Sequence, residues 1–147
     1  MPGTNQFRDD LGDVLFLHTT CPSVGDPTGL GAATTQGSVE IALSTGTLTV
    51  ATTLMTQTQI AYTGYARITL PRNVSDWTNV NGAIDNVILQ QFGNMTGGAG
   101  GTATDFNLTF DTGADYAQWF GVVDTPLAVT VGVNPQFAVG AFNLTIT

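Results

Sequence analysis

The sequence contains no lysine, and its three arginines stand against eleven acidic residues, which gives a formal net charge of −8. Proteins that bind nucleic acid take much of their affinity from Lys and Arg contacts to phosphates. Anionic membrane surfaces likewise attract clusters of basic residues. The shortage of cations therefore removes nucleic acid and membrane surfaces from the expected partners.

Charged residues of either sign are scarce. They make up 10% of the chain, against about 25% in a typical globular protein. The polar surface must therefore consist largely of Thr, Asn, Gln and Ser, whose neutral groups cost less to bury at a contact than ions do. This composition favours a subunit that packs against other subunits, although a biased base composition of the source genome explains it equally well.

Cysteine and histidine occur once each, as Cys21 and His18. A single cysteine cannot form an intrachain disulfide, which fits assembly in a reducing cytoplasm. One Cys and one His cannot build a zinc site, and Ser-His-Asp or Cys-His catalysis would have to use His18. Because no third group that orients this histidine is identifiable, His18 is predicted to be structural, and no metal, cofactor or catalytic residue is expected.

Long apolar runs are also missing. No stretch approaches the roughly 20 apolar residues of a membrane helix, and residues 1–13 lack the apolar centre of a signal peptide. Hydrophobic residues nevertheless make up 42% of the 147 residues, which is enough for an ordinary core. We expect one domain covering residues 1–147, because two halves would be too small to bury much surface.

Alternation of apolar and polar residues with a period of two dominates the chain and predicts strands with one face on the core. The predicted inward set is Phe106, Leu108, Phe110, Phe142, Leu144 and Ile146. Strands are predicted at or near residues 38–43, 47–54, 65–70, 87–92, 105–111, 117–123, 127–132 and 142–147. This number of short strands indicates an all-β antiparallel sandwich, and a jelly roll suits the length best.

Three segments are predicted to contact a partner: an N-terminal arm, Pro2–Asp13, and two glycine-containing loops at residues 19–36 and 93–104. The region 8–18 is either a short helix, since Leu11, Val14 and Leu15 share a helical face, or an edge strand at 14–18. Trp77 is predicted to be a core residue, with an exposed interface anchor as the alternative.

Some motifs suggest chemistry that the rest of the sequence does not support. Asp111-Thr112-Gly113 resembles the catalytic turn of a retroviral-type aspartic protease, but no arginine follows Arg72 to complete that family's pattern. A tight turn with glycine at positive φ is the preferred interpretation. Asp9, Asp10 and Asp13 lack the spacing of a calcium-binding EF-hand and are interpreted as a solvated acidic segment. The chain is therefore not expected to be an enzyme.

One stretch carries a family resemblance. Tyr62-Thr63-Gly64-Tyr65-Ala66-Arg67, followed by Pro71-Arg72 and Trp77, resembles a family of phage virion proteins with a Tyr-Thr-Gly-Tyr-Ala-Arg motif. Further similar segments are residues 39–45, 95–104, 126–129 and 134–135, so the resemblance spans about residues 37–147. The chain departs from the family's His-Thr-Ala-Asp-Pro segment, where it has Ser44-Thr45-Gly46.

The resemblance implies a virion protein without catalytic residues. Some members of the family are similar to capsid cement proteins, which are jelly rolls that sit as small oligomers on the shell, and others are described as tail-fibre proteins. We therefore expect a decoration protein that binds the outside of the major capsid protein shell. We also expect the protein to associate with itself as a homo-dimer or homo-trimer. Its place is the capsid surface of the virion, and the virion is assembled in the cytoplasm of the host bacterium. A tail-fibre or receptor-binding protein is the alternative.

Overall fold

The computed structural model describes residues 4–22, 36–49, 57–110 and 119–146. Its contacts divide the chain into two compact units, which we describe separately. Unit 1 comprises Met1–Ser38, Leu70–Gln90 and Phe137–Thr147, and unit 2 comprises Val39–Thr69 and Gln91–Gln136.

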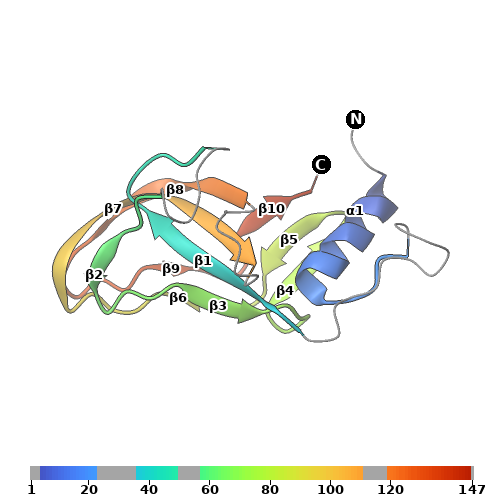
Figure 1. The fold of residues 1–147 in the computed structure, drawn as a ribbon, viewed down its shortest axis with the longest axis horizontal. Helices are drawn as coiled ribbons and strands as arrows, with labels where there is room; N and C mark the ends of the chain where they lie inside the picture. The colour runs from blue at the N-terminus through green and yellow to red at the C-terminus, as the bar shows by residue number, and fades with distance from the viewer. Residues whose placement is uncertain (1–3, 23–35, 50–56, 111–118, 147) are drawn as a thin grey trace. The chain divides into compact units, whose positions relative to one another are not determined.

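A five-stranded sheet runs through unit 2, with the long strand β7 at its centre (Figure 1). The strands are β1 (Ser38–Ser44), β2 (Ala61–Thr63), β3 (Ile68–Pro71), β7 (Gly97–Phe110) and β8 (Trp119–Val129). β7 pairs antiparallel with β1 and β2 in the order β2-β7-β1-β3, and β8 also pairs antiparallel with β7. β7 thus pairs with β2 at its start, with β8 along its middle and with β1 at its end, and residues 105–108 have partners on both sides.

One face of this sheet carries apolar residues on both β1 and β7. Val39, Ile41 and Leu43 are buried, and they lie opposite Phe110, Leu108 and Phe106 respectively. Leu108 is buried and the two phenylalanines are half-buried. The predicted inward orientation of this alternating set is therefore found in the structure.

The opposite face of β7 corrects the expectation that its polar residues point into water. Asp105, Asn107 and Thr109 are all buried. Ser44, which pairs with Asp105, donates its hydroxyl to the carbonyl oxygens of Gly46 and Thr58, both at 2.9 Å. The chain that follows β1 returns beside this strand, where Gln59 bridges Ser44, and simple alternation predicts neither this return nor the burial of the three polar residues.

The glycine-rich stretch also differs from its prediction as a loop. Residues 97–104 belong to β7, and Gly98, Gly100 and Gly101 adopt positive φ angles of 92°, 65° and 144°. A Cβ added to Gly100 would lie 2.2 Å from the carbonyl oxygen of Val129 on β8. Glycine is needed here because the strand adopts backbone conformations closed to other residues while neighbouring backbone packs closely.

A short helix and a three-stranded sheet make up the regular structure of unit 1. The elements are α1 (Asn5–Gly12), the π-helical turn η1 (Asp13–Leu17), β4 (Trp77–Val80), β5 (Ala83–Asn86) and β10 (Asn143–Thr145), with the sheet order β10-β5-β4. The side chain of Thr4 caps α1 by accepting from the Phe7 amide. Asn81 and Gly82 both have positive φ, as a tight hairpin turn between β4 and β5 requires.

The predicted all-β fold with antiparallel strands and a short N-terminal helix is confirmed. The helix alternative therefore holds for residues 8–18, and the helical segment ends at His18, which has the left-handed conformation.

Residues 87–92 contribute only the short strand β6 (Gln90–Gln91), which pairs with β9 (Gln136–Phe137). Strand predictions at 50–54 and 117–118, and the turn at Asp111, lie outside the described residues. No helix in the described ranges is long and apolar enough to cross a membrane.

Candidate interaction surfaces

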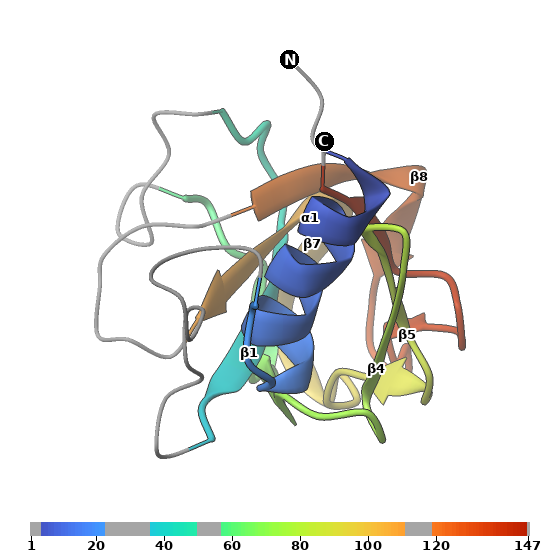
Figure 2. The same cartoon turned by 90° about the vertical axis from the view of Figure 1, so that its right-hand side faces the viewer.

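The N-terminal segment is a docked helix and not a free arm. Asn79 on β4 donates its side-chain amide to the carbonyl oxygen of Asp9 and to the carboxylate of Asp13, both at 2.7 Å. The carboxylate of Asp9 accepts from the amide of Gly82 at 3.0 Å. A Cβ on Gly12 would lie 2.6 Å from Asn79, so the helix axis approaches the hairpin closely (Figure 2). This packing explains the glycine at position 12 and makes the segment part of the unit 1 core.

This arrangement changes how the N-terminal segment can be tested. Deleting residues 2–10 would remove more than a partner contact. Because the deletion removes Asp9 and the buried Asp10, it also removes hydrogen bonds that hold the helix on β4 and β5. Loss of binding after this deletion would therefore reflect a damaged unit 1 as well as a lost contact.

The aspartates of this segment form hydrogen bonds within unit 1. Asp10 accepts from the Gln6 side chain at 2.7 Å, while Asp9 and Asp13 bind the hairpin. Within the described ranges no group of three potential metal ligands comes together. The prediction that these three aspartates form a solvated acidic segment is wrong for Asp10, because its side chain is buried.

Each arginine forms hydrogen bonds within its own unit. Arg72 donates to the backbone carbonyls of Val14 and Leu15, where the helical segment ends and its carbonyls lack helical partners. Burial lowers the pKa of this guanidinium from its ordinary value. Arg8 donates to Asn5, and Arg67 pairs with Glu40 at 3.1 Å. Much of the protein's small positive charge is thus used internally.

The residues that carry the family resemblance form a network inside unit 2. The Arg67 guanidinium donates one hydrogen bond to the carboxylate of Glu40 and another, of 3.2 Å, to the side-chain oxygen of Gln59. The Tyr65 hydroxyl accepts from the Leu43 amide of β1 at 3.1 Å. The Tyr62 hydroxyl donates to a backbone carbonyl, that of Gly93, at 2.8 Å. These contacts connect β1, the motif and the segment before β7, so the motif's polar groups act as structural ties.

The two motif tyrosines give a prediction about pH. Burial raises the pKa of both the Tyr62 and the Tyr65 hydroxyl above their ordinary value of 10.0, and burial is the largest cause for each. A folded pKa above the unfolded one means that the stability contribution is complete below about pH 10 and is lost as the pH rises through the raised pKa. We expect tyrosinate absorbance to appear at higher pH in the native protein than in urea, and stability to fall there.

The control for this titration is Tyr65→Phe. It should remove one of the delayed ionisations while leaving that of Tyr62. Identical titration curves for native and urea-unfolded wild-type protein would contradict the burial of both hydroxyls.

Trp77 is a core residue, which contradicts its alternative role as an exposed anchor. It is only 1% exposed, and its ring makes edge-to-face contacts with Phe16 at 5.2 Å and Phe142 at 5.8 Å. Cys21 is buried as well. Of the predicted contact loop at 19–36, residues 23–35 lie outside the described part of the chain.

A buried asparagine organises two loops of unit 1 in a way that the sequence does not reveal. The Asn86 side-chain amide donates to the carbonyl oxygens of Ile88 and Ala138, both at 2.8 Å, and its oxygen accepts from the Phe142 amide. The loops so joined expose Ile88, Leu89 and Val139. No signal in the sequence distinguishes Asn86 from the many exposed asparagines.

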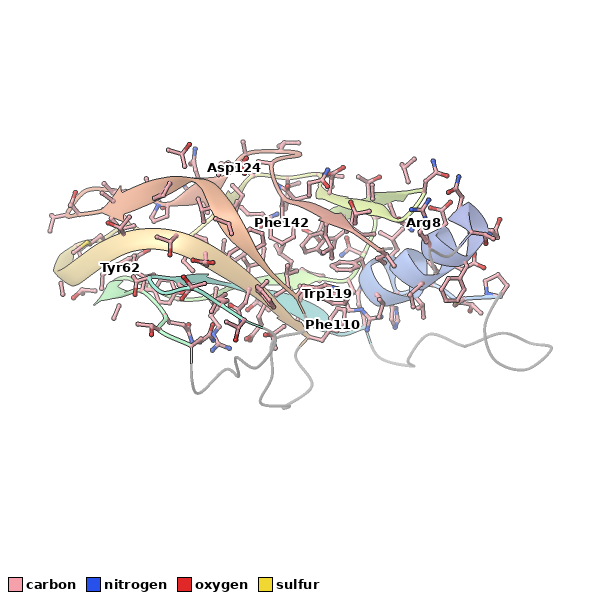
Figure 3. All side chains as sticks on the ribbon, turned by 90° about the horizontal axis from the view of Figure 1, so that it is seen from above. Arg8, Tyr62, Phe110, Trp119, Asp124 and Phe142 are labelled. Carbon is pink, nitrogen blue, oxygen red and sulfur yellow. The ribbon has the colours of Figure 1, made fainter. Side chains whose placement is uncertain are left out.

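The second exposed apolar site lies on β8 of unit 2. Phe120 and Val122 are 41% and 72% exposed, and they share one face of the strand. The other face of the strand turns to the core, where Trp119 contacts Phe110 edge to face at 5.4 Å (Figure 3). The sequence predicts a strand here but not which of its side chains are exposed.

No protein-family model matches this chain, and a search of curated proteins finds no match.

Proposed function

We propose that this protein is a phage capsid decoration protein. It binds the outside of the major capsid protein shell, stabilises that shell and associates with itself as a small oligomer. The observation that carries the proposal is the motif Tyr62–Arg67, which resembles that of phage virion proteins. Its integration into the hydrogen-bond network of an all-β unit supports a structural role for the motif.

The surface of the described residues suits binding to other subunits more than chemistry. The chain carries few charges, and these are mainly carboxylates, so a neutral or basic partner face complements it best. A ligand that binds only the assembled shell stabilises it by mass action. Many identical copies around a closed shell strengthen this effect through avidity.

A tail-fibre or receptor-binding role is the second candidate. Such a protein would present exposed Tyr or Trp side chains to host glycans, and Trp77 is the candidate that the sequence offers. In the described part of the chain Trp77 and Tyr62 are buried, while Tyr65 and Trp119 are half-buried. This burial favours the capsid role over glycan binding.

Electron microscopy of intact virions labelled with antibodies against this chain tests the proposal. We expect label distributed over the head. As a second readout, adding the purified protein to undecorated heads should slow their thermal disruption. Label confined to the tail would contradict the capsid role and support the tail role, whereas virions without label would contradict both.

A further inference from the structure

The turn between β4 and β5 holds the one Asn-Gly pair of the sequence, Asn81-Gly82. Asn81 is exposed, whereas Gly82 is buried. In such a pair the backbone nitrogen of the glycine can attack the side-chain amide carbon of the asparagine, because glycine has no side chain to obstruct the approach. The sequence therefore favours spontaneous loss of a side-chain amide at this turn.

This reaction needs no partner other than water. The Gly82 nitrogen bonds to Cγ of Asn81, the bond from Cγ to Nδ2 breaks, and Nδ2 leaves as ammonia with the proton of the Gly82 amide. Water then opens the resulting succinimide at either carbonyl, which leaves aspartate or isoaspartate at position 81. Before the attack, the Gly82 N–H must give up its proton and its nitrogen must turn toward the Asn81 side chain.

The fold of unit 1 holds Gly82 from two sides and opposes that movement. The N–H of Gly82 donates to the Asp9 carboxylate of α1 at 3.0 Å, and its carbonyl oxygen accepts from the Ile146 amide at 2.9 Å. A Cβ on Gly82 would lie 2.7 Å from the Cβ of Arg8, so α1 packs directly on this residue. The Gly82 nitrogen therefore cannot turn while the helix stays docked.

The acceptor of this N–H opposes the reaction electrostatically as well. The Gly82 nitrogen must develop negative charge in order to attack, and a neighbouring carboxylate disfavours a like charge. The Asp9 carboxylate also engages the proton that must be removed. Asn81 and Gly82 have φ angles of 55° and 79°, so the tight turn fixes the backbone on both sides of the reacting peptide bond.

We propose that Asn81-Gly82 is a modification site controlled by α1. The pair is unreactive while Asp9 binds the Gly82 amide, and it loses ammonia when the helix leaves the hairpin. Isoaspartate lengthens the main chain within the turn, and either product adds a negative charge next to the amide that Asp9 must bind again. A molecule that has reacted therefore does not regain the docked helix, and the modification permanently marks an opening of unit 1. This inference is independent of the proposed capsid role.

Peptide mapping by mass spectrometry, after incubation of the purified full chain at mildly alkaline pH, measures the deamidation rate at position 81. We expect the native wild-type chain to react far more slowly than the same chain unfolded in urea. Asp9→Ala removes the acceptor of the Gly82 amide and should raise the native rate on the order of 10-fold, the equivalent of one net hydrogen bond. Asp124→Ala is the matched control, because it removes an exposed carboxylate of unit 2 and should leave the rate unchanged.

Urea below the unfolding transition tests the control by α1 without a variant, and so decides the question even if Asp9→Ala does not fold. It should raise the deamidation rate and the hydrogen exchange of the Gly82 amide by the same factor, because both require the same N–H to be freed. Deamidation of the native wild-type chain at the unfolded rate overturns the proposal. So does a rate that Asp9→Ala leaves unchanged or lowers, since a lower rate would make Asp9 a base that promotes the reaction. Deamidated chains, separated by their added charge, should exchange faster at residues 5–17, and unchanged exchange there contradicts the loss of docking.

Discussion

Replacing Trp77 by alanine should lower the free energy of unfolding by about 3–5 kcal/mol. The indole is nearly fully buried in unit 1, between Phe16 of η1 and Phe142. Phe142 in turn contacts Phe137 edge to face at 5.6 Å. Removing the ring therefore leaves a cavity at the centre of an aromatic cluster drawn from three separate segments of the chain.

Chemical denaturation measured by circular dichroism checks the size of this effect, and Trp77→Phe is its control. The buried indole nitrogen of Trp77 has no hydrogen-bond partner among the described residues, so its removal breaks no hydrogen bond with them. Phenylalanine keeps an aromatic ring and should cost clearly less than alanine. Hydrogen exchange should show faster opening at residues 5–17 and 77–86 in the alanine variant. A loss under about 1 kcal/mol would contradict the central place of Trp77 in this core.

Local patterning predicts the strands best where one face meets the core and the other meets water. Phe142 is buried, while Asn143 and Thr145 are exposed, as their alternation requires. The same rule fails at Asp105, Asn107 and Thr109, which are polar and alternate with apolar residues but are buried as well. A period of two reports which residues share a face but not what lies against that face.

The candidate interaction surfaces were harder to predict for a related reason. Composition marks the N-terminal segment as an arm, yet Gly12 and Asn79 fit together and dock it as a helix. The exposure of apolar side chains on β8 becomes visible only in the structure, where β7 is the one described strand that pairs with it. Docking and edge position depend on contacts between distant parts of the chain, which no local pattern encodes.

Glycine is the residue whose role the sequence predicts least well. Glycines beside the motif suggest flexibility, but Gly93 and Gly64 are in backbone contact, since a Cβ on Gly93 would lie 1.9 Å from the Gly64 carbonyl oxygen. The same segment presents the Gly93 carbonyl to Tyr62 and places Phe92 in a stack with Tyr65, with ring centroids 5.9 Å apart. These glycines are required for close packing, and one substitution can test this.

Gly93→Ala should destabilise the protein by on the order of 3 kcal/mol, since the added methyl group meets backbone that cannot rotate away. Gly46→Ala is the matched control in the same unit, because its Cβ would meet Thr58 at an ordinary 3.6 Å, and its stability should change by less than about 1 kcal/mol. Urea denaturation of both variants measures the difference.

The tyrosine titration then shows where the damage lies. If the methyl group displaces the Gly93 carbonyl, Tyr62 loses its acceptor and becomes more exposed, so its raised pKa should fall back toward the ordinary value. Ionisation of Tyr62 should then begin at lower pH in Gly93→Ala than in Gly46→Ala. Equal stability and equal titration of the two variants would mean that the backbone contact between Gly64 and Gly93 does not hold the motif in place.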